Sequence, residues 1–243
     1  MILTAKGIHY KELNEQIKEA LAYNKEITLE KVEGQRYLGA AMDKGKTLLI
    51  KGTPGNDMAC YMNGGRIVVF GNGQDGTANT MGGGEIVIHG RCGDAVGYGM
   101  RDGEVYIRDD VGWRSGIHMK EYGAAKPVLI IGGCAGAYLG EYMAGGVIIL
   151  LGEGAGKEGP IGDYCGTGMH GGVIYIRGRY DTNKVSKEVE AVPCTAADME
   201  LIRGYVSRYC EYFGANYEAA MAVEFTKLKP VSSRPYEKLY VKN

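Results

Sequence analysis

The sequence has no hydrophobic run long enough to cross a membrane and no excess of charge of one sign. Its longest aliphatic run is Val147–Leu151, whereas a spanning helix needs about 20 apolar residues. The 28 basic side chains are balanced by 29 acidic ones, which gives no electrostatic footprint for DNA, RNA or anionic lipid. The first residues lack the apolar segment of a signal peptide. We therefore expect a cytoplasmic protein that binds neither nucleic acid nor membrane.

Cysteine and histidine are too scattered to indicate a metal or redox site. The six cysteines are Cys60, Cys92, Cys134, Cys165, Cys194 and Cys210. No two have Cys-x-x-Cys spacing, so zinc and iron–sulfur sites have no support, and buried thiols in a reducing compartment are the simpler interpretation. With only four histidines, we find no set of nucleophile, base and orienting group. The sequence predicts no catalytic residue, no metal site and no cofactor in this chain.

Two glycine-rich segments resemble phosphate-binding loops, but each lacks a required partner. Gly71–Gly76 has the GxGxxG spacing of dinucleotide-binding folds, yet no helix pattern follows to hold a pyrophosphate. Gly152–Lys157 resembles a phosphate loop, yet Glu158 stands where a magnesium-binding hydroxyl is required. We interpret both segments as turns.

Glycine is unusually abundant in the middle of the chain. Of 40 glycines, only Gly7, Gly204 and Gly214 lie outside residues 34–178. Within that stretch about one residue in four is glycine, against about 7% in ordinary proteins. The stretch also contains regular aliphatic segments, which a disordered linker would lack. The glycines therefore mark turns between repeated elements.

Seven aliphatic segments recur along this stretch, and their closing residues are 19 to 26 residues apart. They are Leu48–Gly52, Ile67–Gly71, Ile86–Gly90, Val105–Asp109, Val128–Gly132, Ile148–Gly152 and Ile174–Gly178. A methionine precedes each segment, with a glycine three or four residues later. These methionines are Met42, Met62, Met81, Met100, Met119, Met143 and Met169. Such a recurring period indicates stacked repeats.

Alternation within the segments predicts how the repeats stack. Two and four residues before each closing residue the side chain is always aliphatic, and alternate residues of a strand share one face. The intervals are too short for βαβ units, which take about 30 residues, and the identical register favours parallel coils over an antiparallel meander. We therefore predict an all-β fold, a single-stranded parallel β-helix (solenoid) of about seven rungs, roughly 30 Å long.

The two ends of the chain have helical patterns. Residues 10–23 form an amphipathic helix pattern. Its apolar face consists of Leu13, Ile17, Ala20 and Leu21. Thr195 and Asp198 form a capping-box pattern before a second helix that should end at Gly214. A third, short helix is expected within 216–225.

These patterns divide the chain into three parts. We interpret 1–33 as an N-terminal helical cap, 34–178 as the β-helix repeat domain, and 179–243 as a helical or extended C-terminal tail. The end strands of a solenoid present open ladders that need covers. The terminal segments are therefore interpreted as caps, with partner-docking arms as the alternative.

A stripe of apolar residues lies three positions before each closing residue, on the face that should point away from the bore. Such a stripe exceeds the apolar area that a free surface normally shows. Either the terminal segments cover it or another protein does. The candidate interface residues on this stripe are Val68, Val87, Tyr106, Leu129 and Tyr175.

The repeats resemble a known family. Gly136–Gly152, Gly162–Gly172 and Gly93–Met100 resemble the GXGXG repeat domain at the C-terminal end of the glutamate synthase large subunit. The segments His9–Lys18 and Gly34–Gly39 are similar to the form in which this domain is a separate polypeptide, as in archaeal-type glutamate synthases (glutamate synthase alpha subunit domain 3). The resemblance covers nearly the whole chain.

This resemblance implies a right-handed β-helix without catalytic residues. In that family the domain braces a glutaminase component and a synthase component, which makes glutamate from 2-oxoglutarate. The resemblance thus implies that FMN and iron–sulfur clusters reside in partner subunits and that this chain belongs to an oxidoreductase complex of nitrogen metabolism. The expected partners are glutaminase-type and synthase-type polypeptides, and a homo-oligomer stays open.

Two alternatives have different support. The same repeat occurs in one component of formylmethanofuran dehydrogenase, so a β-helix component of that complex is the alternative function, although the N-terminal segment resembles it less. An enzyme acting on sugars or acyl groups is disfavoured. The sequence shows neither the six-residue aliphatic period of hexapeptide acyltransferases nor the acid cluster of polysaccharide-cleaving β-helices.

Overall fold

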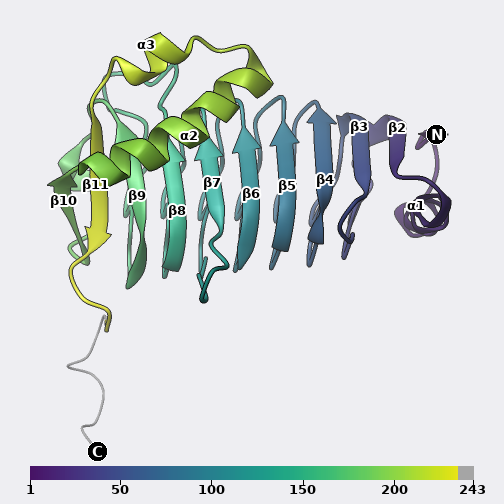
Figure 1. The fold of residues 1–243 in the computed structure, drawn as a ribbon, viewed down its shortest axis with the longest axis horizontal. Coiled ribbons are helices and arrows are strands. Elements are labelled where there is room, and N and C mark those ends of the chain that lie inside the picture. Colours follow the sequence, from purple (N-terminus) through teal and green to yellow (C-terminus); the bar gives the residue numbers. More distant parts are fainter. Residues whose placement is uncertain (235–243) are drawn as a thin grey trace, which may run out of the picture.

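The computed structural model describes residues 1–234 as one long sheet that coils around a bore, with helices at both ends (Figure 1). The strands are β1 (Ile2–Thr4), β2 (Glu26–Glu33), β3 (Thr47–Thr53), β4 (Asn63–Phe70), β5 (Gly82–Ile88), β6 (Asp102–Ile107), β7 (Val128–Ile131), β8 (Ala144–Leu150), β9 (Gly171–Arg177), β10 (Val189–Pro193) and β11 (Phe225–Pro230). The helices are α1 (Tyr10–Tyr23), α2 (Ala196–Phe213) and α3 (Tyr217–Met221), with a 3₁₀ turn at Thr182–Lys184.

The predicted parallel solenoid is confirmed. The seven repeat segments are β3 to β9, between which the chain makes six turns, and each strand pairs in parallel with the next. The register places equivalent residues of successive repeats side by side, for example Ile67 beside Ile86 and Val69 beside Ile88. The ladder also extends upstream of residue 34, because β2 pairs in parallel with β3 and β1 with β2.

The predicted register is wrong by one residue in β7. Val105 pairs with Leu129 and Ile107 with Ile131, so Leu129 and Ile131 point into the bore while Val128 and Ile130 lie on the outer face. All four residues of β7 are aliphatic and buried. The strand therefore has no polar position that could have shown which face points inward.

Each coil turns through a corner, which we define as the six residues that end at a repeat methionine. In every corner the first, third and fifth residues have left-handed backbone conformations; in one corner Tyr138, Gly140 and Tyr142 have φ of 63°, 67° and 51°. Consequently the N–H groups alternate in direction. Tyr138 donates to the carbonyl of Asp163 in the next coil (2.8 Å), whereas Gly140 donates to Ser115 in the preceding coil (2.9 Å).

The second corner residue supplies a column of bore side chains that the strand pattern did not reveal. The column consists of Leu38, Met58, Thr77, Val96, Ser115, Leu139 and Cys165, all fully buried or nearly so. Its two hydroxyls stay satisfied because Thr77 and Ser115 donate to the carbonyls of Gln74 and Gly112. Mixed polar and apolar residue types hid this column. The repeat methionines lie beside it in the same core.

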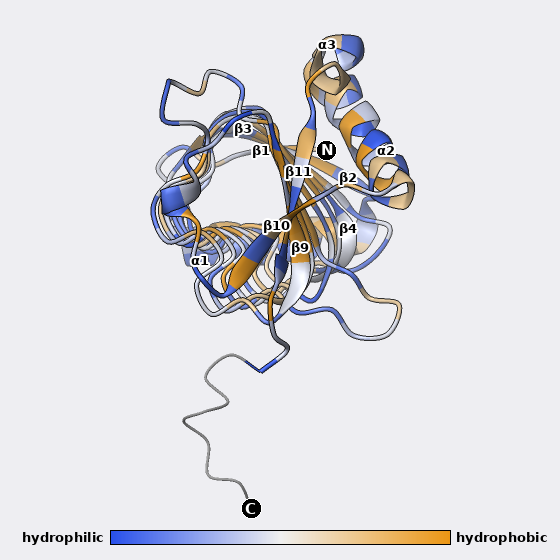
Figure 2. Ribbon diagram, turned by 90° about the vertical axis from the view of Figure 1, so that its left-hand side faces the viewer, coloured by the Kyte–Doolittle hydropathy of each residue, from blue (hydrophilic) through white to orange (hydrophobic). Residues whose placement is uncertain are grey.

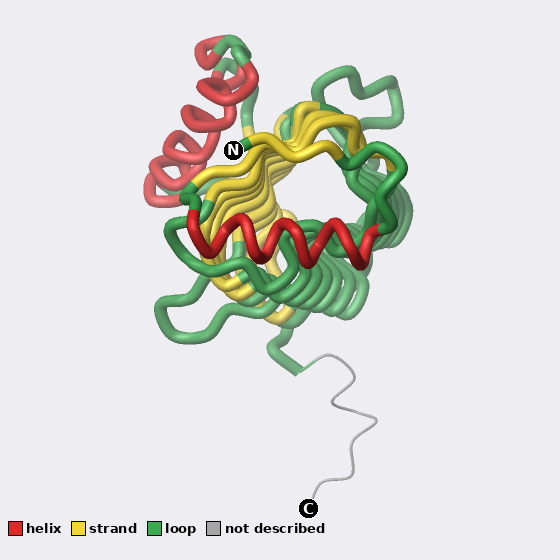
Figure 3. Tube along the Cα trace, turned by 90° about the vertical axis from the view of Figure 1, so that its right-hand side faces the viewer, coloured by secondary structure: helices red, strands yellow, loops and turns green. Residues whose placement is uncertain are grey.

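The helical ends agree with their sequence patterns. Helix α1 buries Leu13, Ile17, Ala20 and Leu21, and it crosses the N-terminal end of the coil (Figure 3). Helix α2 begins with a capping box between Thr195 and Asp198 and ends at Gly214, which is left-handed. Beyond β9 the pairing becomes antiparallel, since β11 pairs antiparallel with β9 and β10 pairs antiparallel with β11 (Figure 2). Residues 235–243 of the expected tail lie outside the described residues.

The corner geometry makes a testable difference between two glycines. A valine Cβ at Gly140 would lie 2.7 Å from Ile174 Cδ1, whereas no atom lies within 4 Å at Gly154, and φ is positive at both (67° and 76°). Each substitution therefore carries the left-handed backbone cost, about 1–3 kcal/mol. Only Gly140→Val adds overpacking, about 1–3 kcal/mol more.

We therefore expect urea unfolding to show a clearly larger loss of stability for Gly140→Val than for Gly154→Val. Equal losses would mean that the third corner residue does not face a packed bore.

Candidate partner interface

The predicted interface stripe is covered by the chain itself. Val68, Val87, Tyr106 and Tyr175 are at most 5% exposed, and they form one apolar cluster with residues of α2. These α2 residues are Ile202, Val206, Tyr209 and Cys210. Leu129, the fifth candidate, lies in the bore because of the register of β7. The stripe is therefore not a free docking surface, and of the two covers considered the internal one is present.

Polar contacts hold α2 on the outer face of the sheet. Arg208 forms an ion pair with Glu104 of β6 at 2.7 Å, and the Tyr212 hydroxyl donates to Glu85 of β5 at 2.6 Å. Tyr212 also packs edge-to-face against Tyr106, with ring centroids 5.1 Å apart. Ion pairs that are partly desolvated and lie beside aromatic rings fix the position of a helix more than they stabilise it. Helix α2 is an integral part of the fold.

The start of α2 is anchored by a buried carboxylate. Asp198 accepts hydrogen bonds from the Tyr175 hydroxyl (2.6 Å) and Lys227 (2.8 Å) and from the backbone and side chain of Thr195. Burial alone would raise the pKa of Asp198, but these hydrogen bonds together hold it well below its usual range. The carboxylate therefore stays charged and ties α2 to both β9 and β11.

The end of α2 packs on a histidine. The His89 ring stacks on Phe70 at 5.1 Å between centroids and meets Phe213 edge-on at 5.1 Å. Burial, with a smaller effect from the charges of Arg108 and Arg66, lowers the pKa of His89. The folded chain therefore favours the neutral imidazole here.

This shift predicts a pH dependence of stability. An unfolded histidine takes up a proton near pH 6.5, whereas His89 in the folded chain does so only at lower pH. The unfolded state thus binds more protons, and the folded state loses stability as pH falls through this range. His89→Phe keeps an aromatic ring between Phe70 and Phe213 but cannot titrate.

We expect wild type to lose more stability than His89→Phe between pH 8 and pH 5.5 in urea unfolding. Parallel losses in the two proteins would show that His89 does not contribute to the pH dependence.

The cysteines do not provide a site for a metal or an iron–sulfur cluster. Within residues 1–234, no group of three or more Cys, His, Asp or Glu side chains is arranged to hold a metal ion. Burial raises the pKa of Cys92 to about 11 and that of Cys165 to about 12. Both thiols are therefore protonated at neutral pH in the metal-free chain.

The outward side of the corners is the most unusual surface of the molecule. Seven bulky side chains, which we call the corner ladder, occupy the first or fifth corner position with φ between 51° and 63°. They are Tyr37, Tyr61, Arg114, His118, Tyr138, Tyr142 and Tyr164. The remaining first and fifth positions hold glycine or smaller side chains, namely Ala41, Asp57, Gly76, Thr80, Ala95, Gly99 and Gly168. A left-handed non-glycine residue costs about 1–3 kcal/mol, and such residues cluster at functional sites.

Stacking in the C-terminal half of the corner ladder offsets part of this cost. The Arg114 guanidinium lies 4.6 Å from the centroid of the Tyr138 ring, which in turn stacks on Tyr164 at 5.0 Å. His118 stacks on Tyr142 at 5.4 Å with only 10° between the ring planes. Such aromatic and cation–π contacts contribute about 0.5–1.5 kcal/mol each. The backbone therefore holds these rings in two ordered columns.

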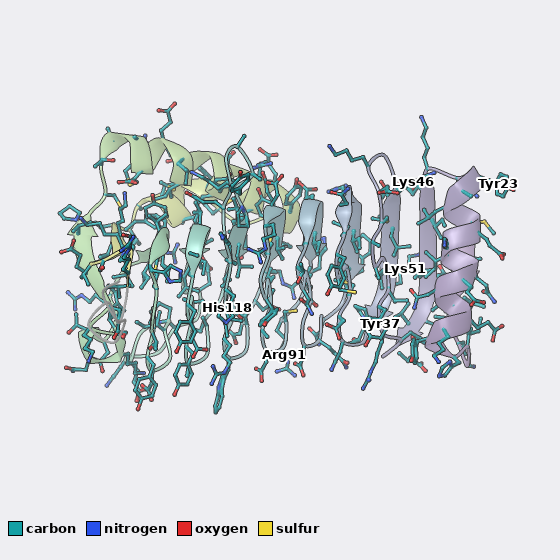
Figure 4. All side chains as sticks on the ribbon, turned by 90° about the horizontal axis from the view of Figure 1, so that it is seen from below. Tyr23, Tyr37, Lys46, Lys51, Arg91 and His118 are labelled. Carbon is teal, nitrogen blue, oxygen red and sulfur yellow. The ribbon has the colours of Figure 1, made fainter. Side chains whose placement is uncertain are left out.

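The corner ladder is also exposed. Tyr61 and Tyr164 are 64% and 58% exposed, and Trp113, beside Arg114, is 60% exposed. Figure 4 places Tyr37 and His118 on the side of the coil away from α2. Ordered aromatic and arginine side chains are the residues that carry most binding energy in protein interfaces. The corner ladder is therefore the candidate partner interface.

The sequence contained a signal for this surface. Large side chains recur one and five positions before the repeat methionines, as in Tyr138 and Tyr142 before Met143. His118, one position before Met119, lies in a turn. The aliphatic strand positions repeat one residue type, whereas these outward columns mix Tyr, Arg and His with small residues, so their period is less visible in the sequence.

Comparison with known proteins agrees with this geometry. A family model described as the GXGXG motif matches residues 11–232. The chain belongs to the GXGXG motif family. In this chain the third corner position is glycine in five of the seven corners, as its left-handed backbone favours.

A relative is similar to the chain along nearly its whole length. The chain is 47% identical over 252 residues to an uncharacterized protein of Methanocaldococcus jannaschii, and the match covers 99% of this chain and 96% of the relative. The similarity therefore extends over nearly the whole length of both proteins. Among residues 1–234, no helix is both long and apolar enough to cross a membrane.

Replacing one residue of the corner ladder by glycine should change the free energy of unfolding little. Tyr164→Gly relieves a left-handed residue and adds chain entropy to the unfolded state, effects of opposite sign and about 1 kcal/mol each. It also loses one stacking contact of similar size. We expect its free energy of unfolding to stay within about 1 kcal/mol of wild type, measured by urea unfolding.

Tyr175→Gly is the matched control, because the same side chain is lost from a buried strand position. It should cost about 3–5 kcal/mol. A comparable loss for Tyr164→Gly would show that the ladder serves the fold and is not a free surface.

Proposed function

We propose that this chain is a cytoplasmic, non-catalytic structural subunit of a glutamate synthase. It would brace a glutaminase-type polypeptide and a synthase-type polypeptide during glutamine-dependent formation of glutamate from 2-oxoglutarate. FMN and iron–sulfur clusters are expected in those partners. The GXGXG motif family, which is linked to the glutamate synthase large subunit, supports this assignment over residues 11–232.

The observation that carries the proposal is the corner ladder. A chain that needed only to fold could place glycine at all these positions, as it does at Gly99 and Gly168. Instead, exposed Tyr and Arg side chains are retained at a cost in backbone conformation. That cost is explained if the side chains contact another protein.

The solenoid also has the mechanical properties that a brace requires. One hydrogen-bonded sheet runs through nine parallel strands, β1 to β9, and the bore is filled by a continuous core cluster. Close-packed protein interiors deform little. Two partners bound to different coils would keep a fixed separation, so ammonia released at one active site could reach the other before it escapes.

Reconstitution tests the proposal. The purified chain is mixed with the glutaminase-type and synthase-type polypeptides of its organism, and complex formation is measured by size-exclusion chromatography. We expect a complex and a several-fold rise in glutamine-dependent glutamate formation. Ammonia-dependent synthesis should change less, because it needs no coupling to a second site.

A variant with Tyr138→Gly, Tyr142→Gly and Tyr164→Gly serves as the interface test. It should stay folded by circular dichroism but lose assembly, whereas Tyr23→Ser, an exposed tyrosine on α1, should assemble normally. Full glutamine-dependent activity without this chain would refute the brace. Capture of molybdenum or tungsten dehydrogenase polypeptides from cell extract would instead support a formylmethanofuran dehydrogenase component.

A further inference from the structure

A groove of about 730 Å³ separates α1 from the first corner of the coil. One wall is α1, with Tyr10, Asn14, Ile17 and Leu21, and the other is the first corner and the residue after it, with Tyr37, Gly39, Met42 and Asp43. Tyr10 and Tyr37 approach each other at one end, with ring centroids 5.9 Å apart. The groove lies at the N-terminal end of the solenoid, where Figure 4 shows Tyr37 and Lys46 beside α1.

Two backbone N–H groups, one in the first corner and one directly after it, have no acceptor among the described residues, although the equivalent groups of later coils do. In each of the six later corners, the third residue donates its N–H to the preceding coil, as Gly140 does to Ser115. The residue after the methionine does the same, as Asn63 does to Met42 (3.0 Å). The equivalent donors are Gly39 in the first corner and Asp43 directly after it, and within residues 1–234 neither N–H has a hydrogen-bond acceptor.

Helix α1 covers the bore but does not continue the corner. Its apolar side chains close the core, while its carbonyls are used along the helix or at its end, where the Lys46 ammonium contacts the Leu21 carbonyl. The Asn14 amide nitrogen donates to the carbonyls of Tyr10 and Arg36, and among the described residues no hydrogen bond joins the Asn14 side chain to Gly39. The equivalent N–H groups of later coils point toward the coil before them. The N–H groups of Gly39 and Asp43 therefore point to where a preceding coil would lie, and that place is the groove that both residues line.

We propose that this groove binds an extended segment of a partner polypeptide, which continues the corner ladder by one coil. Main-chain carbonyls of the segment accept from Gly39 and Asp43, and an apolar side chain packs against the Tyr10–Tyr37 ring pair. This is strand addition to an open ladder end, in which main-chain hydrogen bonds give affinity and a pocket gives specificity.

The net positive charge of the groove lining favours a segment rich in hydrogen-bond acceptors. Its charged residues are Lys11, Lys18, Lys46, Glu15 and Asp43, one more base than acids, and neither Lys11 nor Lys18 forms an ion pair among the described residues. The proposal rests on the structural role above, because it takes the segment from one of the polypeptides that the chain would brace.

Amide hydrogen exchange of the isolated chain and of the reconstituted complex tests the proposal directly. In the isolated chain, the N–H groups of Gly39 and Asp43 should exchange rapidly, whereas those of Gly140 and Asn63 should be protected. In the complex, exchange at Gly39 and Asp43 should slow by about tenfold or more, as expected of amides that gain a hydrogen bond.

Filling the groove provides a second test. Ala40 is exposed and lines the groove, so Ala40→Trp should weaken the complex by about tenfold through steric conflict. Ala124→Trp, an exposed position outside the groove, should assemble as wild type does.

The outcomes separate this inference from the proposed function. If wild type binds neither partner, the structural role fails. If it binds both while Gly39 and Asp43 stay unprotected and Ala40→Trp assembles normally, only the groove inference fails. Protection that rises with the concentration of the isolated chain would assign the groove to a second copy and would also overturn the inference.

Discussion

The structure depends on one constraint, the alternation of left-handed residues through every corner. In a parallel coil each corner lies between two others, and its main-chain groups must find partners on both sides because they are partly shielded from water. Left-handed residues at alternate positions turn successive N–H groups toward opposite neighbours, so Tyr138 reaches the next coil and Gly140 the preceding one. The strands alone would make a sheet, and the corners make it close into a coil.

This constraint explains the composition of the chain and its two distinctive surfaces. Position three of the corner is glycine or alanine in every corner, and at four of its five glycines an added Cβ would lie 2.5–2.8 Å from a side-chain atom of the bore. Positions one and five face outward, where only the backbone conformation is restricted, and they can hold Tyr, His or Arg at a cost. The corner ladder occupies these outward positions, and the groove beside α1 lies where the first corner has no preceding neighbour.

Most of the fold follows from the repeat, whereas the candidate site does not. Strand positions, parallel pairing and both long helices were predictable because period-two and helical patterns coincide with strong turn and cap residues. Leu129 was placed outside because Val128–Ile131 is apolar on both faces and carries no alternation. Whether α2 or another protein covers the outer stripe depends on long-range contacts of Arg208 and Asp198, which sequence spacing does not encode. The cost of a left-handed tyrosine is likewise invisible until the backbone angles are known.

The two ends of the solenoid are not equivalent, and this gives the chain a direction. At the C-terminal end β11 runs antiparallel to β9 and β10 antiparallel to β11, which stops the parallel ladder, and Pro193 on the outermost strand β10 discourages further pairing. At the N-terminal end β1 adds only three residues to the sheet, while the first corner and the residue directly after it keep two donors without partners among the described residues. Strand addition is therefore favoured at one end only. On our proposal, a scaffold with one closed end and one open end would accept one partner segment without polymerising, as a brace between different proteins would need to.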